Sequence, residues 1–374
     1  MKIAILTLPL HTNYGGILQA YALQTVLQKM GHNVVILDKV LYSKELPLYK
    51  KYFVYFKRLI KKYIFKSIST IYIEEHFNDI KRTIRQNTQK FIDVNVNRYE
   101  INNLYNLKQG KYDTIIVGSD QIWRPEYYKP IENAFLDFAN KWSIKRIAYA
   151  PSFGTNEWEY TEEQTIKCKK LLSKFNSVSV RELSGVTLCK EKFNINAELV
   201  LDPTLLLDKK DYIRLFESKG VEKSDGDLMV YILDNSDFAT DLVREISKKR
   251  GLKPFKTNCD KTDSWDVPLL ERIQPPLENW LRGFYDAKLV VTDSFHACVF
   301  SIIFNKPFIV INNNKRGNAR IDSLLKVFNQ EYRLIHDVID INNNEKIYTS
   351  PNVEDLLSKK KQDSLSFLVN SLDN

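Results

Sequence analysis

Short apolar runs alternate with segments of helical periodicity along the first half of the chain. The run at 1–8 is followed by helical spacing over 16–30, which ends at Gly31, and then by a second apolar run at 32–38. A glycine just past a helix is a common C-terminal signal. Further apolar runs that end in small or polar residues lie at 112–120, 146–154, 177–182 and 198–206. This alternation predicts a parallel sheet with covering helices.

A second alternating series follows a charged stretch. Its predicted strands are 227–234, 254–259, 288–294 and 306–312, and its predicted helices are 237–249 and 279–287. The fold class predicted is therefore α/β, with two Rossmann-like domains facing a cleft. The predicted units are an N-terminal domain, a linker, a C-terminal domain and a final helix that packs back on the first domain, at 1–207, 208–226, 227–349 and 350–374.

Residues 42–100 interrupt the first series as a basic insertion. Between residues 42 and 90 there are 12 Lys and Arg against 4 Asp and Glu. Within it, one helical arc is apolar: Tyr49, Tyr52, Phe53, Phe56, Ile60, Tyr63 and Ile64. The opposite arc is basic: Lys50, Lys51, Lys57, Arg58, Lys61 and Lys62. Such an amphipathic helix either buries its aromatic face on its own domain or docks on an anionic membrane surface. Nucleic acid is not expected, because no recognition motif accompanies the charge.

Composition sets the class of protein. A length of 374 residues, 44% hydrophobic and 27% charged, suits two globular domains. The four cysteines are scattered without a CxxC pair, which argues against a disulfide framework or zinc site and favours a reducing, cytoplasmic compartment. Residues 3–10 are interpreted as a strand rather than a signal peptide, and no apolar run reaches about 18 residues.

The segment KLVVTDSFHACVFS, at 288–301, carries the clearest chemical signal. It predicts a buried strand followed directly by a helix, with Asp293 or Ser294 as the N-cap residue and His296 in the first turn. Ligands of open α/β sheets bind at the carboxyl ends of strands, and helix N-termini favour anions. The alternative is a histidine satisfied within a loop.

Two other strand ends carry candidate binding residues. Asn13-Tyr14-Gly15-Gly16 follows the first strand, and glycines there allow backbone N–H groups to approach a ligand. The pattern matches neither GxGxxG nor a P-loop, and a plain turn is the alternative. In Gly118–Trp123, Asp120 could accept a proton from a hydroxyl and Trp123 could stack on a sugar; the alternative is a helix cap with a core tryptophan.

Arginines mark two candidate anion sites. Arg181 follows the strand at 177–180 and offers five donors to phosphate or carboxylate, or else pairs with Glu182 or another neighbour. A polar loop after the last long strand forms the second candidate: Arg316, Gly317, Asn318 and Arg320.

Seven blocks of the sequence resemble the polysaccharide pyruvyl transferase family. They are TLPLHTNYGGILQAYAL (7–23), VGSDQIW (117–123), SFG (152–154), SVRE (179–182), DPTLLL (202–207), TDSFHA (292–297) and the segment 318–325. They run in the family's order. Two departures are Ala297-Cys298, where members often have Gly-Thr, and the basic insertion.

The resemblance implies a GT-B-like fold and transfer of pyruvate from phosphoenolpyruvate onto two sugar hydroxyls, which gives a cyclic ketal and phosphate. It puts Asp120, Arg181 and His296 in the cleft as catalytic residues. We expect His296 to protonate the donor, Asp120 to deprotonate a hydroxyl, and Arg181 and Arg320 to hold the anion. The expected donor-binding residues are Ser294, Asn318 and Arg320. The expected acceptor-binding residues are Asn13, Tyr14, Gly15, Gly16, Gln121 and Trp123.

The expected partners are phosphoenolpyruvate and a sugar acceptor that is lipid-linked or free, with no metal or other cofactor. The expected location is the cytoplasm, with its membrane face as the site if the basic helix docks there. Two alternatives stay open: a GT-B glycosyltransferase that uses a nucleotide sugar, and a non-catalytic sugar- or phosphate-binding protein.

Overall fold

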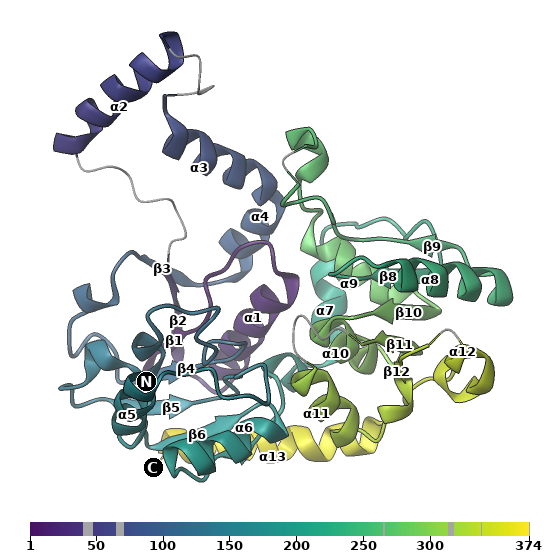
Figure 1. Cartoon of the computed structure of the whole chain (residues 1–374). Coiled ribbons are helices and arrows are strands. Elements are labelled where there is room, and N and C mark those ends of the chain that lie inside the picture. Colours follow the sequence, from purple (N-terminus) through teal and green to yellow (C-terminus); the bar gives the residue numbers. More distant parts are fainter. Residues whose placement is uncertain (40–47, 65–70, 265, 313–317, 338, 374) are drawn as a thin grey trace.

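The chain builds two parallel sheets that lie side by side (Figure 1). This computed structural model describes all residues except 40–47, 65–70, 265, 313–317, 338 and 374. Within the described residues the first sheet has seven strands in the order β3-β2-β1-β4-β5-β6-β7. Their bounds are β1 (Lys2–Leu6), β2 (Asn33–Lys39), β3 (Arg98–Ile101), β4 (Thr114–Val117), β5 (Lys145–Ala148), β6 (Ser177–Val180) and β7 (Glu198–Leu199).

The second sheet is smaller and has, in the described part of the chain, five strands in the order β12-β11-β10-β8-β9. Their bounds are β8 (Leu228–Tyr231), β9 (Pro254–Phe255), β10 (Leu289–Thr292), β11 (Phe308–Ile311) and β12 (Leu334–Ile335). The central strands β4, β10 and β11 are buried at every residue, because helices cover both faces of a parallel sheet. This explains why they appear in the sequence as unbroken apolar runs.

Helices surround both sheets. Their bounds are α1 (Tyr14–Lys29), α2 (Leu48–Tyr63), α3 (Ile73–Ile84), α4 (Gln86–Asn95), α5 (Glu162–Leu172), α6 (Leu183–Leu188), α7 (Lys209–Glu217), α8 (Asp237–Arg250), α9 (Leu277–Asp286), α10 (Phe295–Ile303), α11 (Ala319–Val327), α12 (Asp340–Asn343) and α13 (Glu354–Asp373). Among the residues that the structure describes, no helix is long and apolar enough to cross a membrane.

The segment 208–226, predicted as a linker, contains a packed helix. Helix α7 starts with a capping box at Asp208, and its Tyr212 and Phe216 are fully buried. The Tyr212 ring meets the edge of Phe300 in α10 at 4.9 Å between centroids. The charged pattern hid this helix, because its apolar face consists of only a few residues. The connection between the sheets is therefore part of the core.

The last helix, α13, runs back beneath the first sheet (Figure 1). The N–H of Leu201 donates to the Ser364 hydroxyl at 2.9 Å, and the rings of Tyr149 and Phe367 lie 6.1 Å apart. At its other end, Glu354 accepts a hydrogen bond from the Asn305 side chain of the second domain, so α13 contacts both domains on the side opposite α2 and α3.

Helices α2 and α3 form an arm that stands away from the sheets (Figure 1). The interpretation that α2 buries its aromatic face on its own domain is wrong, because Tyr52, Phe53 and Phe56 are exposed. Tyr49, Lys50 and Lys51 of the predicted helix are in α2, but their side chains lie outside what the structure describes.

Candidate active site

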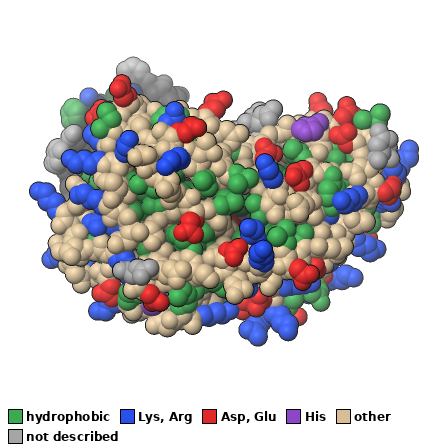
Figure 2. Space-filling view, turned by 90° about the horizontal axis from the view of Figure 1, so that it is seen from below, with side chains coloured by type: hydrophobic (Ala, Val, Ile, Leu, Met, Phe, Trp, Pro, Cys, Tyr) green, Lys and Arg blue, Asp and Glu red, His purple; other side chains and the backbone are tan. Residues whose placement is uncertain are grey.

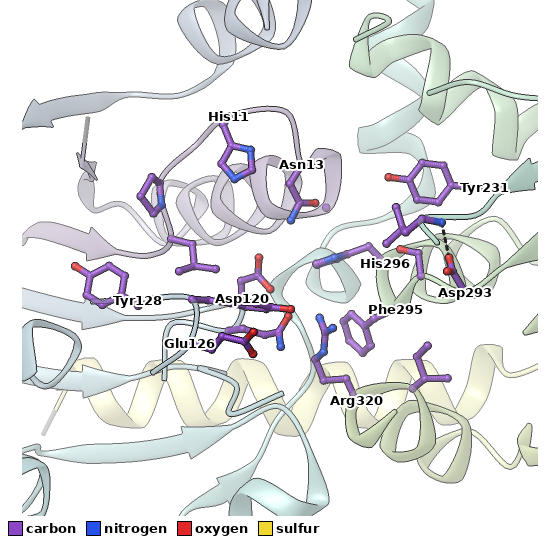
Figure 3. A pocket seen from close by; sticks show the side chains of 18 of the residues that line it. His11, Asn13, Asp120, Glu126, Tyr128, Tyr231, Asp293, Phe295, His296 and Arg320 are labelled. Carbon is purple, nitrogen blue, oxygen red and sulfur yellow. Dashed lines mark hydrogen bonds between the residues drawn. The ribbon is translucent and has the colours of Figure 1, made fainter. Parts of the chain in front are cut away.

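A cleft of about 490 Å³ opens between the two sheets, at the carboxyl ends of their strands (Figure 3). The first domain lines it with the loop after β1, the start of α1 and the segment after β4. The second domain contributes the end of β8, the turn from β10 into α10, and the start of α11. This is the position at which open α/β sheets bind ligands.

His296 projects into this cleft from the first turn of α10. Its ring packs against the start of α1, where a Cβ on Gly15 would lie 2.1 Å from Nδ1. Gly15 is therefore needed to seat the imidazole rather than to shape a turn. In Figure 3, His296 and Arg320 extend from the second domain toward Asp120 of the first.

The predicted cap of α10 differs in detail. Ser294 is the N-cap residue, but its side chain makes no capping hydrogen bond. The Asp293 carboxylate instead accepts the N–H groups of Leu233 and Asp234 at 2.7 and 3.1 Å, which ties the end of β8 to that of β10. Among the described residues, the first N–H groups of α10 thus have no side-chain cap at the cleft.

A buried charge cluster, made of Asp120, Arg181, Asp202 and His296, extends inward from the cleft surface. Arg181 Nη1 is 2.6 Å from Asp202 Oδ2, and Nη2 is 3.4 Å from Asp120 Oδ1. His296 Nε2 is 3.6 Å from the same Asp202 oxygen. Arg181 and Asp202 have almost no exposed side-chain surface. Two carboxylates, one guanidinium and one imidazole therefore share a site shielded from water.

Arg181 is not among the residues that line the cleft, which differs from the direct grip on an anion expected of it. Its guanidinium is enclosed by the two carboxylates and lies 4.4 Å from the centroid of the Phe295 ring. The expected alternative partner, Glu182, instead accepts the N–H groups of Phe153 and Gly154. The geometry gives Arg181 the task of holding Asp120 and Asp202 in place.

The carboxylates of the cluster are ionised at neutral pH. Burial alone would raise the pKa of Asp120, but Arg181, His296 and Arg320 outweigh burial and lower it. Burial likewise opposes ionisation of Asp202, yet the nearby His296 imidazole and the charge of Arg181 hold its pKa far below the usual range. Both side chains therefore carry negative charge, Asp120 at the cleft surface and Asp202 behind it.

Arg320 supplies positive charge at the cleft surface. Burial and the neighbouring Arg181 lower the pKa of Arg320 to about 10, while Asp120 acts in the opposite direction. The guanidinium is still protonated at neutral pH. Its Nε has no hydrogen-bond partner among the described residues, and its carbon lies 5.7 Å from the Phe295 ring centroid. A small anion in the cleft could accept a hydrogen bond from this Nε–H group.

The expected acceptor-binding residues separate into two groups. Asn13, Gly15 and Gln121 line the cleft. Gly16 does not line the cleft. Its N–H donates to the side chain of Asn13, the N-cap residue of α1. Tyr14 is fully buried, and its hydroxyl donates to the carbonyl of Pro275 at 2.6 Å, so it joins the two domains rather than meeting a ligand.

Trp123 is a core residue, and the expectation that it stacks on a sugar is corrected. It is fully buried, its ring stacks on Phe135 at 5.0 Å, and its Nε1 donates to the Ala134 carbonyl. Because the segment after β4 turns inward at Ile122 and Trp123, the indole faces the first domain's core instead of the cleft.

The expected donor-binding residues also divide. Ser294 and Arg320 line the cleft. Asn318 does not line it; its side-chain amide donates to Asn312, which steadies the approach to α11. Arg316 and Gly317 lie outside the described residues.

Several residues of the site escaped prediction. Asp202 opens the DPTLLL block and lies in the buried charge cluster; the available signal was an aspartate at the end of an apolar run. The segment after β4 also contributes a polar wall without any periodic pattern to reveal it. The remaining unpredicted polar residues of the lining are His11, Lys39, Glu126, Tyr127, Tyr128, Lys129 and Tyr231.

The sequence model of polysaccharide pyruvyl transferases matches residues 13–315. This chain belongs to the polysaccharide pyruvyl transferase family. The match covers most of the chain and includes Asp120 and His296, which lie on opposite walls of the cleft. The resemblance drawn from the seven sequence blocks is thereby confirmed.

Similarity to individual proteins is more distant. General stress protein 30 of Bacillus subtilis (strain 168) is 26% identical over 226 residues, which are 57% of this chain and 62% of that protein. The UDP-GlcNAc 2-epimerase of Neisseria meningitidis, solved with UDP-GlcNAc, has 10% identity and a TM-score of 0.52 over 100% of this chain and 99% of its own. That likeness shows the fold alone, and the predicted two-domain, GT-B-like α/β class is confirmed.

Among the residues the structure describes, no three His, Cys, Asp or Glu side chains are grouped so as to hold a metal ion. The four cysteines are free thiols, and three of them are buried.

Proposed function

We propose that this pyruvyl transferase moves the pyruvyl group of phosphoenolpyruvate onto two hydroxyls of a sugar, which yields a cyclic ketal and inorganic phosphate. The observation that carries the proposal is the meeting of three groups at one cleft. They are the cationic Arg320, the uncapped start of α10 with His296, and the ionised Asp120 on the opposite wall.

The donor's negative charge fits the second domain's side of the cleft. Arg320 offers a guanidinium whose Nε has no hydrogen-bond partner in the described part of the chain, and guanidinium groups bind phosphate or carboxylate through paired hydrogen bonds. The N-terminus of α10 adds backbone N–H donors and the positive end of its dipole. We assign the phosphate and carboxylate of the donor to these two features, with the Ser294 hydroxyl beside them.

The reaction needs one proton delivered to carbon and two removed from oxygen. His296 protonates the methylene carbon of the donor, and a hydroxyl of the sugar attacks C2 as it loses its proton to Asp120. The second hydroxyl then forms the other C–O bond at C2, the C–O bond to phosphate breaks, and phosphate leaves with the second hydroxyl's proton. The proton taken up by Asp120 thus balances the proton that His296 gave to carbon. General acid–base help of this kind is worth about 10²–10⁴-fold in rate.

Asp202 and Arg181 act through their neighbours. Asp202 lies 3.6 Å from His296 Nε2 and supports the protonated imidazole, while Arg181 fixes both carboxylates. We call them positioning residues, since the geometry gives neither a place on the cleft surface.

A coupled assay tests this proposal. The protein is incubated with phosphoenolpyruvate and a panel of methyl glycosides that carry adjacent or 4,6-related hydroxyls, and phosphate release is measured alongside product mass. We expect phosphate release only with an acceptor, together with a mass gain of one pyruvate less one water. Transfer from a nucleotide sugar, with none from phosphoenolpyruvate, would instead establish a glycosyltransferase. Binding of phosphoenolpyruvate without turnover on any acceptor would favour a non-catalytic protein.

A further inference from the structure

Helix α2 presents a continuous apolar surface to solvent. This surface, called the α2 outer face, consists of six side chains of α2 and of the residue that follows it, and they are between 45% and 81% exposed: Tyr52, Phe53, Phe56, Leu59, Tyr63 and Ile64. At about 100° per residue they fall within one arc of the helix. Single exposed apolar residues are ordinary, but a contiguous aromatic patch of this kind marks an interaction surface.

The helix is attached to the rest of the molecule by its other side. Arg58 pairs with Glu74 of α3, with Nη2 2.7 Å from Oε1, and also donates to the carbonyl of Ile71. The Tyr55 hydroxyl donates to Glu75, and its ring meets that of Tyr72 edge-on at 5.0 Å. Tyr55 and Arg58 lie on the arc opposite Phe53 and Phe56. The α2 outer face is therefore turned away from α3 and covered by nothing in the described residues.

Positive charge borders this face. Lys57 Nζ lies 4.4 Å from the centroid of the Phe53 ring, and Lys62 Nζ lies 5.7 Å from that of Tyr63. The sequence has no Asp or Glu between Glu45 and Glu74. By contrast, the face seen from below α13 mixes acidic and basic side chains (Figure 2). Aromatic rings flanked by lysines, without acidic neighbours, match the chemistry of an interface rich in anionic headgroups.

We propose that the α2 outer face docks on the surface of an anionic lipid bilayer. The helix lies in the plane of the interface, with the aromatic and aliphatic side chains among the headgroups and upper acyl chains. The lysines remain at headgroup level, where each basic residue near an anionic surface adds to the attraction.

The arm connects this surface to the cleft wall. Helix α3 has 12 residues and is about 18 Å long. The carbonyl of its last residue, Ile84, accepts the N–H of Gln274 at 2.9 Å, and the Gln274 side chain donates to the Thr12 carbonyl beside His11 of the cleft. Docking thus brings the cleft close to the membrane. The consequence that the sugar acceptor is carried on a membrane lipid rests on the proposed function; the docking itself does not.

Flotation of the full chain with vesicles tests the docking. Vesicles of phosphatidylcholine with about one third phosphatidylglycerol are compared with pure phosphatidylcholine, at low and at high salt. We expect binding to the anionic vesicles at low salt, and at least about tenfold less on neutral vesicles or at high salt. The Phe53→Ser/Phe56→Ser variant should lose at least about tenfold in binding to the anionic vesicles.

Matched variants separate a specific face from general stickiness. Val94→Ser/Ile166→Ser removes two equally exposed apolar side chains from α4 and α5, and should bind as the unmodified chain does. Lys57→Gln/Lys61→Gln/Lys62→Gln should weaken binding, whereas Lys167→Gln/Lys169→Gln/Lys170→Gln on α5 should not. Far-ultraviolet circular dichroism and thermal unfolding confirm that each variant is folded.

A second readout reports insertion directly. Trp fluorescence of a Phe53→Trp variant should shift to the blue and be quenched by brominated anionic lipid, while an Ile166→Trp variant should show neither change. Failure of the unmodified chain to bind anionic vesicles at low salt would overturn the proposal. So would dimerisation in the absence of lipid that Phe53→Ser/Phe56→Ser abolishes, because the face would then be a contact between two copies. Either result is independent of whether phosphoenolpyruvate is the donor.

Discussion

The cleft and the α2–α3 arm depart from the usual placement of side chains in opposite ways. Behind the cleft wall, Arg181 and Asp202 carry full charges with almost no exposed surface. On the arm, Phe53 and Phe56 expose most of their rings to water. Buried charges are expensive unless paired, and exposed aromatic patches are uncommon on soluble surfaces.

Each departure has its own form of compensation. Arg181 is paired with Asp120 and Asp202 within the protein, so these charges are in place before any substrate arrives. The rings of Phe53 and Phe56 are left mostly uncovered by the described residues. The first region is therefore expected to depend on internal contacts, and the second on something outside the chain. The predictions that follow test this difference.

The largest effect is expected at Arg181. Arg181→Met leaves Asp120 and Asp202 buried beside each other without their shared cation, and breaking such a buried pair costs about 3–5 kcal/mol. The free energy of unfolding, measured with urea, should fall by that amount, and transfer activity should be lost. Arg181→Lys should recover part of the stability.

An exposed ion pair provides the control for this loss. Arg244 lies 2.5 Å from Asp241 on α8, with both side chains more than half exposed. Arg244→Met should cost less than about 1 kcal/mol. Equal losses at the two arginines would mean that the buried charge cluster is not a stabilising unit, and the contrast with the arm would fail.

His296 should separate activity from stability. Because the imidazole faces the cleft, His296→Ala should lower the turnover number by about 10²–10⁴-fold while the protein remains folded. Phosphate release measures the first quantity, and thermal unfolding the second. The exposed His336→Ala serves as the matched variant and should turn over normally. Near-normal turnover of a folded His296→Ala protein would remove this side chain from the mechanism.

Gly15 tests the seating of the imidazole without altering any charge. A Cβ at this position would lie 2.1 Å from Nδ1 of His296, so Gly15→Ala must displace the ring. We expect turnover to fall by about tenfold or more, which corresponds to about 1.4 kcal/mol in the barrier. At Gly16 the nearest atom to a Cβ is a side-chain nitrogen of Asn13 at 3.2 Å, so Gly16→Ala should have a smaller effect. The reverse order would show that the glycines serve the helix turn instead.

Acid should weaken the protein through the cluster's carboxylates. The pKa of Asp202 is far lower in the folded than in the unfolded chain, because His296 and Arg181 overcome the opposing effect of burial. Its contribution to stability is fully present above the unfolded pKa near 4. It is lost as the pH falls toward the folded pKa, because the unfolded chain binds the proton first.

Urea unfolding between about pH 5 and pH 3 measures this linkage. The unmodified chain should lose stability more steeply than Asp202→Asn, by up to about 1.4 kcal/mol per pH unit. Parallel slopes for the two proteins would contradict the depressed pKa of Asp202.

These residues also show what the sequence could and could not reveal. Strand ends were visible, because parallel strands buried on both faces give unbroken apolar runs, and so Asp120 and His296 were found. The sequence does not encode which way a loop turns after its strand. The sequence therefore suggested that Trp123 contacts a ligand, whereas its ring packs on Phe135. It likewise suggested that Arg181 binds the substrate, whereas two carboxylates enclose its guanidinium.

The arm also shows a feature that the sequence does not reveal, namely whether an apolar face is covered. Periodicity alone identified its aromatic and basic arcs, but could not tell whether the aromatic arc is covered. Coverage depends on where α3 packs, and the Arg58–Glu74 pair joins residues 16 positions apart. Contacts between distant segments decide such questions, whereas patterns within a single element do not.

The smallest expected effect is on the free energy of unfolding of a variant of the arm. A small change is what an exposed docking face predicts. If the α2 outer face serves an external surface, its rings contribute little to folding, because they are exposed in the folded chain nearly as in the unfolded one. Phe53→Ser/Phe56→Ser should change the free energy of unfolding by no more than about 0.5 kcal/mol in the absence of lipid. Trp123→Ala, which removes an equally aromatic but fully buried side chain, should cost about 3–5 kcal/mol. A loss of several kcal/mol in the arm variant would mean that the face is covered in solution by the protein itself, and the arm would then resemble the cleft in depending on internal contacts.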